Sequence, residues 1–144
     1  MSAILREDAA IRVLIADDHE MVRAGLRMIV EDEDDMRVVG EAADGAEALR
    51  LALALRPAVL LADLRMPPPD GIELARLLRG AAPETRTVIV TAHEDSEIAA
   101  EAQAAGALGY VVKRGGPAAL LDAIRAVAAG DACFGILAQR APRR

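Results

Sequence analysis

Residues 11–26 read IRVLIADDHEMVRAGL, and this stretch decides the fold. The run Ile11–Ala16 is nearly all apolar, as expected of a strand that is buried on both faces of a sheet. Two acidic residues, Asp17 and Asp18, follow it directly. Apolar residues then recur at helical spacing, at Val22, Leu26 and Ile29. The stretch therefore predicts a buried strand, an acidic loop at its carboxyl end and an amphipathic helix.

The same unit repeats along the chain. Four further runs are predicted as strands, at Met36–Glu41, Ala58–Ala62, Thr87–Thr91 and Gly109–Val112. Each is followed by an apolar stripe at helical spacing: Ala46, Leu49 and Leu53; Ile72, Ala75 and Leu78; Ile98, Ala102 and Ala105; Leu120, Ile124 and Val127. This alternation of strand and helix predicts an α/β domain with a parallel sheet and right-handed crossovers.

Local signals mark where the helices begin and end. A capping residue stands three positions before a glutamate at Asp17–Glu20, Asp44–Glu47, Asp70–Glu73 and Thr91–Glu94. Pro57 and Pro83 predict breaks after the second and third helices, and Pro117 suits the first turn of the last helix.

Composition limits the possible classes of protein. A chain of 144 residues, 53% hydrophobic, suits one domain. Its net charge of −6 argues against a basic nucleic-acid surface on this chain. The single cysteine, Cys133, excludes a disulfide framework and a multi-cysteine metal site. No apolar run approaches the roughly 20 residues that span a bilayer, and the N-terminus turns acidic too soon for a signal peptide, so we expect a cytoplasmic protein.

Polar residues gather at the predicted strand ends, where open α/β sheets bind ligands. The first strand ends in Asp17 and Asp18, the third in Asp63, the fourth in Thr91, and the fifth in Lys113, the only lysine of the chain. Three neighbouring carboxylates repel one another, and a divalent cation relieves that repulsion; oxygen ligands suit Mg²⁺. The lysine and the threonine would then supply a charge and a hydroxyl to an incoming phosphate.

Structural explanations remain open for most of these residues. Asp17 or Asp18 could cap the first helix, Thr91 could cap the fourth, and Lys113 could be a solvated charge. Asp63 differs, because Met66 stands three residues on and three prolines follow, so no helix begins there for it to cap. For His19 and His93, which lack the spacing of a zinc motif, we expect positions at the surface or behind the ligands.

The sequence strongly resembles the receiver domain of two-component response regulators. The matching stretches are IRVLIADDHEMVRAGL, DLRMPPPDGIEL, VIVTA, GALGYVVK and LLDAIRAVAAG, which lie within about residues 11–130. The DDH opening, the GYVVK string and the AIRAVAAG helix are most similar to the NarL subfamily, whose output is a LuxR-type helix-turn-helix. The resemblance implies a flavodoxin-like (βα)5 doubly wound parallel sheet with strand order 2-1-3-4-5.

The resemblance also implies a role for each strand-end residue. Asp63 becomes the acceptor of a phosphoryl group from a sensor histidine kinase, so the protein is a switch and not an enzyme in the ordinary sense. Asp63 would also bind Mg²⁺, together with Asp17, Asp18 and the Arg65 backbone carbonyl. The remaining roles are Thr91 as the switch hydroxyl, Lys113 as the phosphate-pairing cation, and Tyr110 as the switch aromatic. Arg65 and His93, two residues after Asp63 and Thr91, are expected to set the lifetime of the phosphoryl group. Partners would include a second copy after phosphorylation, and DNA only through an output domain outside this chain; no membrane partner is expected.

The sequence differs from the usual receiver pattern at a few positions, and two other protein classes with related folds are weighed against it. Arg114 follows Lys113 where many receivers have proline, which predicts a trans peptide bond, and Pro68 and Pro69 stiffen the loop after Asp63. Residues 1–10 are predicted as an extension, 11–130 as the receiver, and 131–144 as a tail or a linker to an absent output domain, which leaves a fragment and a stand-alone receiver both open.

A haloacid-dehalogenase-like phosphatase would need a second aspartate where Arg65 stands. A flavin or nucleotide module would need a Gly- or Ser/Thr-rich loop after the first strand.

Overall fold

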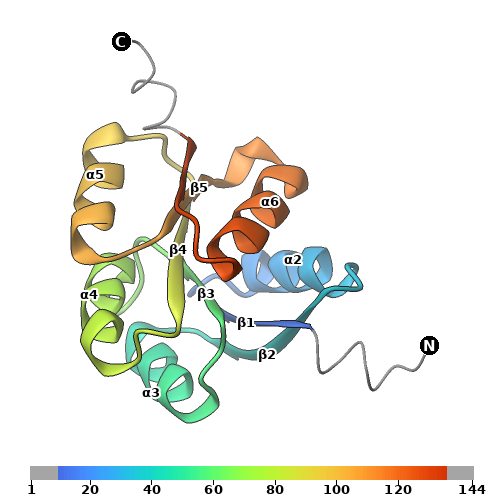
Figure 1. Cartoon of the computed structure of the whole chain (residues 1–144), viewed down its shortest axis with the longest axis horizontal. Coiled ribbons are helices and arrows are strands. Elements are labelled where there is room, and N and C mark those ends of the chain that lie inside the picture. The colour runs from blue at the N-terminus through green and yellow to red at the C-terminus, as the bar shows by residue number, and fades with distance from the viewer. Residues whose placement is uncertain (1–9, 136–144) are drawn as a thin grey trace.

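The computed structural model describes residues 10–135, which form a parallel six-stranded sheet with helices on both faces (Figure 1). The strands are β1 (Ile11–Ala16), β2 (Met36–Ala42), β3 (Val59–Asp63), β4 (Arg86–Thr91), β5 (Gly109–Val112) and β6 (Cys133–Phe134). Their order in the sheet is β2-β1-β3-β4-β5-β6. The flavodoxin-like fold and the order 2-1-3-4-5 are therefore confirmed, with a sixth strand added beyond β5.

Five α-helices cover the sheet: α2 (Glu20–Glu31), α3 (Gly45–Leu55), α4 (Gly71–Ala81), α5 (Ser96–Ala105) and α6 (Pro117–Ala128). A short 3-10 helix, η1 (Lys113–Gly115), joins β5 to α6. Side chains alternate along β3, so that Leu60 and Ala62 pack with α3, α4 and α5, while Val59 and Leu61 pack with α2 and α6. Two hydrophobic cores result, one on each face of the sheet.

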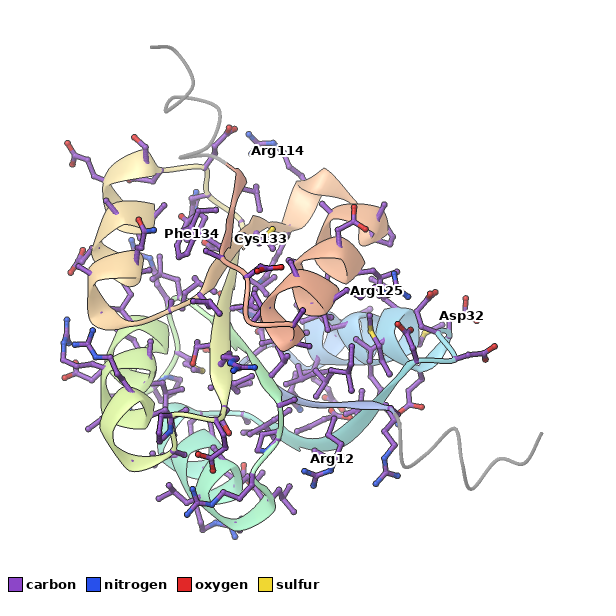
Figure 2. The ribbon with its side chains drawn as sticks, viewed as in Figure 1. Arg12, Asp32, Arg114, Arg125, Cys133 and Phe134 are labelled. Carbon is purple, nitrogen blue, oxygen red and sulfur yellow. The ribbon has the colours of Figure 1, made fainter. Side chains whose placement is uncertain are left out.

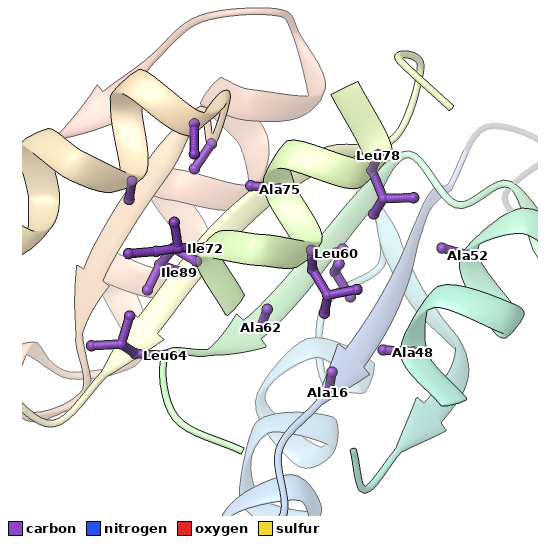
Figure 3. Close-up of a cluster of buried hydrophobic side chains, with 14 of the residues drawn as sticks. Ala16, Ala48, Ala52, Leu60, Ala62, Leu64, Ile72, Ala75, Leu78 and Ile89 are labelled. Carbon is purple, nitrogen blue, oxygen red and sulfur yellow. The ribbon is translucent and has the colours of Figure 1, made fainter. Parts of the chain in front are cut away.

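The buried face of α3 differs from the apolar stripe that the sequence predicted for this helix. Ala46 and Leu53 are exposed, and the alanines of α3 that are buried against β1 and β2 are Ala48 and Ala52 (Figure 3). Because α3 is apolar on almost every side, periodicity alone does not choose its buried face. The small alanine side chains let the helix approach the sheet closely, and this close packing makes the choice.

Two of the four predicted helix caps are confirmed and two are wrong. Asp44 and Asp70 accept hydrogen bonds from the backbone N–H groups of Glu47 and Glu73, at 2.8 and 2.9 Å. The N-cap of α2, however, is His19 rather than Asp17, and α5 begins only at Ser96 with Asp95 as its cap. Asp17 and Thr91 are thus not used as helix caps.

The segment after residue 130, predicted as a tail or linker, contributes a strand. Its residues Cys133 and Phe134 pair in parallel with Gly109 and Tyr110 of β5. Phe134 is buried on the side of α5, and Cys133 lies on the side of α6 (Figure 2). A strand of two residues carries no periodicity, which is why the sequence did not reveal it. Among the described residues, no helix has the length and apolar character needed to cross a membrane.

Candidate functional site

The carboxyl edge of the sheet brings the predicted polar residues together. Asp17 directly follows β1, Asp63 and Thr91 end β3 and β4, and Lys113 directly follows β5. These four strands are consecutive neighbours in the sheet. Asp17, Asp63 and Thr91 are buried, with relative exposures of 1%, 8% and 2%. Buried polar side chains at adjacent strand ends form a site in which charges interact strongly, because little water screens them.

Three carboxylates at this edge fit a metal ion. Asp17, Asp18, His19 and Asp63 each offer one ligand atom, and these atoms all lie within 4.8 Å of one another. Carboxylate oxygens are the ligands that hard divalent cations such as Mg²⁺ prefer, so the donor set suits the predicted ion. His19 lies at the surface, as expected, with its side chain 68% exposed. Its Nδ1 is also 3.3 Å from Asp17 Oδ1 and 3.1 Å from Asp18 Oδ1, so it belongs to the cluster. Its position two residues after Asp17, in the same loop, is the sequence signal for this contact.

Asp17 is fixed by contacts from four sides. Its backbone N–H donates to the carbonyl of Ala42 at 3.0 Å, and its Oδ1 accepts from the backbone N–H of His19 at 2.8 Å. Lys113 Nζ donates to its Oδ2 at 3.1 Å. Arg23 donates from a terminal guanidinium nitrogen to the Asp17 carbonyl at 2.7 Å. Backbone and side chain are therefore both held, and the carboxylate faces the site in a defined orientation.

Asp63 lies at the mouth of the same site. Lys113 Nζ is 3.6 Å from its Oδ1, close enough for an ion pair. Burial raises the pKa of the Asp63 carboxyl above its ordinary value, the charge of Asp17 raises it further, and the charge of Lys113 opposes both. An uncompensated negative charge at this point is thus costly, and a bound cation would relieve it.

The loop after Asp63 is held by backbone contacts to two helix starts. Gly71 N–H donates to the carbonyl of Leu64 at 3.2 Å, and Gly45 N–H donates to that of Pro67 at 2.8 Å. A Cβ atom at Gly45 would lie 1.7 Å from the Pro69 carbonyl oxygen, so only glycine fits there. The loop is therefore fixed on both sides.

Two details of the site loops bear on earlier expectations. Arg65 is exposed at the surface of the loop after Asp63. The peptide bond between Pro68 and Pro69 is cis. It is the only cis bond among the described residues, so the bond that follows Lys113 is trans, as predicted.

Thr91 and Tyr110 hold the loop that follows β4 from two ends. Thr91 Oγ1 accepts a hydrogen bond from the backbone N–H of His93 at 3.3 Å. The Tyr110 hydroxyl donates to the carbonyl of the same residue at 3.0 Å. Tyr110 is only 3% exposed, so its ring already points inward. Burial and the charge of Asp95 raise the pKa of its phenol. A hydroxyl in the site and a buried aromatic outside it are thereby linked through one backbone segment.

The family model described as the response regulator receiver domain matches residues 13–125. Among curated proteins, the transcriptional regulatory protein YxjL of Bacillus subtilis (strain 168) is 44% identical over 124 residues, which are 86% of this chain and 57% of that protein. The transcriptional regulatory protein LiaR of the same strain is 42% identical over 84% of this chain and 57% of its own length. The chain thus spans a little over half the length of these relatives.

Solved structures that match the chain include response regulators and an isolated REC domain. A LuxR-family two-component response regulator from Aurantimonas sp. SI85-9A1 is 38% identical and has a TM-score of 0.85. The match covers 92% of this chain and 99% of that chain. The isolated REC domain of RcsB from Salmonella enterica serovar Typhimurium, in the presence of phosphomimetic BeF3−, is 28% identical with a TM-score of 0.81, over 90% of this chain and 97% of that one.

Proposed function

Because the chain belongs to the response regulator receiver domain family, we propose that it is a phosphorylation-dependent switch whose phosphoacceptor is Asp63. One observation carries the assignment. Asp63 ends the buried strand β3 at the mouth of the site, and its Oδ1 lies 3.6 Å from the ammonium group of the only lysine of the chain. Asp17, by contrast, is occupied on its backbone and on both carboxylate oxygens.

The group transferred is a phosphoryl group from a phosphohistidine of a sensor histidine kinase. A carboxylate oxygen of Asp63 forms a bond to phosphorus while the phosphorus–nitrogen bond breaks, and the electron pair of that bond returns to the imidazole of the partner. Such transfer passes through a loose transition state, so the protein contributes mainly positioning and charge compensation. Asp17, Asp18 and the Arg65 backbone carbonyl would hold Mg²⁺, which when bound offsets the charge on the phosphoryl oxygens. Lys113 would add its ammonium as a further partner of those oxygens.

Thr91 and Tyr110 carry the signal away from Asp63 in this proposal. A phosphoryl oxygen at Asp63 is a new acceptor for the Thr91 hydroxyl, which here accepts from the His93 N–H. A shift of Thr91 moves the loop that Tyr110 holds at the His93 carbonyl. The surface formed by α5, β5 and α6 therefore responds to phosphorylation. We propose that a second copy of the chain docks on this surface after phosphorylation.

Control of transcription is the output that the relatives support. LiaR is named a transcriptional regulatory protein, and a solved relative is the two-component response regulator RcsB in complex with DNA. Action on DNA would then require a helix-turn-helix domain outside residues 1–144. A stand-alone receiver that acts by protein contact is the alternative, and sedimentation of the chain with and without beryllofluoride, together with the length of the natural gene product, distinguishes the two.

Phosphorylation with Mg²⁺ and acetyl phosphate tests the assignment. The parent chain should gain one phosphoryl group by intact mass, and Asp63→Asn should gain none. Asp122→Asn, which changes an exposed carboxylate on α6, is the matched control and should be labelled like the parent. Labelling of Asp63→Asn would contradict the proposal. Rapid repeated turnover of the donor would instead favour a phosphatase of the haloacid-dehalogenase type.

A further inference from the structure

We propose that Arg23 is a positioning residue for the cation site, holding the loop Asp17–His19 so that its carboxylates face the metal. The inference rests on the proposed function, because it concerns the same site. Arg23 lies in the first turn of α2, which begins at Glu20. Its guanidinium donates to the Asp17 carbonyl at 2.7 Å, and its own backbone N–H donates to the His19 carbonyl at 3.0 Å. The backbone bond is the ordinary first-turn bond of α2, so the guanidinium is what links this helix to the Asp17 end of the loop.

The Asp17 carbonyl needs such a partner. Asp17 N–H makes a sheet-like bond to Ala42, but past this point the chain leaves β1 and turns toward α2. The residue is 1% exposed, so its carbonyl has little access to water. A buried carbonyl without a donor is costly, and a hydrogen bond from a charged donor is stronger than one from a neutral donor. The contact therefore favours one orientation of the peptide that leads into Asp18.

A glutamate at the end of β2 keeps the guanidinium in place. Glu41 lies 3.5 Å from Nε of Arg23, and its other oxygen lies 2.9 Å from Nε of Arg27. In the sheet, Glu41 is the register partner of Ile15, two residues before Asp17. Arg23 is therefore held between strand β2 and the acidic loop, and its side chain is only 18% exposed. Arg27 shares the glutamate but is 56% exposed, and its ion pair joins it to β2 rather than to the loop.

A positioning role and a purely electrostatic role of Arg23 predict opposite changes in Mg²⁺ affinity when Arg23 is removed. If Arg23 acted only as a cation near the carboxylates, its loss would make the site more negative and strengthen Mg²⁺ binding. If it orients the loop, its loss lets the carboxylates turn away and weakens Mg²⁺ binding. Residues that orient metal ligands without touching the metal typically change affinity by about 10–100-fold. Because Glu41 offsets much of its charge, we expect the positional effect to dominate.

Titration calorimetry of the full chain with Mg²⁺ tests this inference. Arg23→Ala should raise the Kd for Mg²⁺ about tenfold. Arg27→Ala is the matched control, since it removes the same charge from the same helix and the same glutamate, and its Kd should stay within about twofold of the parent. Arg23→Lys keeps the charge, but a point ammonium cannot replace the planar fork, so its Kd should rise at least about threefold.

Hydrogen exchange without metal provides an independent readout. The His19 amide, which donates to Asp17 Oδ1, should exchange faster in Arg23→Ala than in the parent and in Arg27→Ala. A parent-like or tighter Kd in Arg23→Ala, or unchanged exchange at His19, overturns the inference. If Arg23→Ala does not fold, a parent-like Kd in Arg23→Lys overturns it instead. If the parent chain neither binds Mg²⁺ nor gains a phosphoryl group, the proposed function fails, and exchange at His19 still decides the role of Arg23.

Discussion

The ammonium group of Lys113 lies 3.1 Å from Oδ2 of Asp17 and donates a hydrogen bond to it. The same nitrogen is 3.6 Å from Asp63, so the lysine is shared between two buried carboxylates and is nearer to the one that is not the proposed acceptor. In the metal-free protein, Lys113 therefore compensates charge that a cation would otherwise compensate.

Lys113→Ala should destabilise the metal-free protein and slow its phosphorylation. Removing the lysine leaves the Asp17 carboxylate, which is nearly inaccessible to water, without its charged donor. The cost of such a loss is about 1–3 kcal/mol in the free energy of unfolding. Urea unfolding measures it, and Mg²⁺ should restore part of the loss. Arg114→Ala is the control, because its ion pair with Glu94 is exposed and such pairs contribute little. Equal effects of the two substitutions would contradict the prediction.

The contribution of Asp63 to the stability of the metal-free protein should fall as the pH rises through its pKa. Burial and the charge of Asp17 raise the pKa of this carboxyl in the folded state. The folded protein then binds this proton more tightly than the unfolded chain, so the contribution of Asp63 to the free energy of unfolding decreases between its unfolded and folded pKa, from about pH 4 upward. Asp63→Asn lacks this titration, so its stability relative to the parent should grow with pH. A difference that stays constant across urea unfolding at several pH values would refute the prediction.

Asp18→Ala should weaken Mg²⁺ binding and raise the melting temperature of the metal-free protein. Asp18 belongs to the cluster of ligand atoms, so its removal takes a charged ligand from the cation and also relieves repulsion among the remaining carboxylates. Calorimetry with Mg²⁺ and thermal unfolding without it measure the two effects. Asp122→Ala, on the surface of α6, should change neither. An unchanged Mg²⁺ affinity in Asp18→Ala would exclude this residue from the site.

The lifetime of the phosphoryl group should depend on Arg65 and His93. Hydrolysis needs a water molecule in line with the bond between Asp63 and phosphorus, and both side chains are exposed on loops that follow site residues. Arg65 can pair with the phosphoryl group and exclude water, whereas His93 can orient a water molecule near neutral pH. Dephosphorylation rates of Arg65→Ala and His93→Ala across about pH 6–8 test this. Rates within about twofold of the parent, equal to less than ~0.5 kcal/mol in the barrier, would show that neither residue controls the lifetime.

Most of the fold could be predicted because its signals are local and strong. A strand buried on both faces is a short apolar run, and β1, β3, β4 and β5 all have that form. Strand β2 is less apolar, and it lies at the edge of the sheet. The strand ends in turn predicted the site, since parallel strands bring their carboxyl ends to one edge. Here the sequence pattern and the physical requirement of the site agree.

The failures have a common cause: the same local pattern fits more than one structure. The spacing Thr91–Glu94 fits a helix start. The residue that caps α5 is instead Asp95, whose carboxylate accepts hydrogen bonds from the N–H groups of Glu97 and Ile98. Likewise Asp17 matches a cap by spacing, yet its carboxylate bonds to His19 and Lys113. A competition between neighbouring residues for one role depends on distances that the sequence does not contain.

Phe134→Ala should lower the free energy of unfolding by about 2–3 kcal/mol, because it removes a buried ring that lies beside Tyr110 in the sheet. This is below the usual range for a buried phenylalanine, since β6 is a short strand at the edge of the sheet. Urea unfolding measures the loss. Met28→Ala, at a site that is 72% exposed, is a control that should change little. A loss below about 0.5 kcal/mol, the size of an ordinary surface substitution, would show that β6 does not contribute to the core.

The pairing of β6 with β5 makes the one cysteine of the chain a native chemical probe. Cys133 is partly buried, its backbone N–H donates to the carbonyl of Leu108 at 2.8 Å, and burial raises the pKa of its thiol. A raised pKa and limited access both slow alkylation while the strand is paired. The rate at which Cys133 is alkylated in the wild-type chain therefore reports how often this edge of the sheet opens. No cysteine has to be introduced or removed for the measurement.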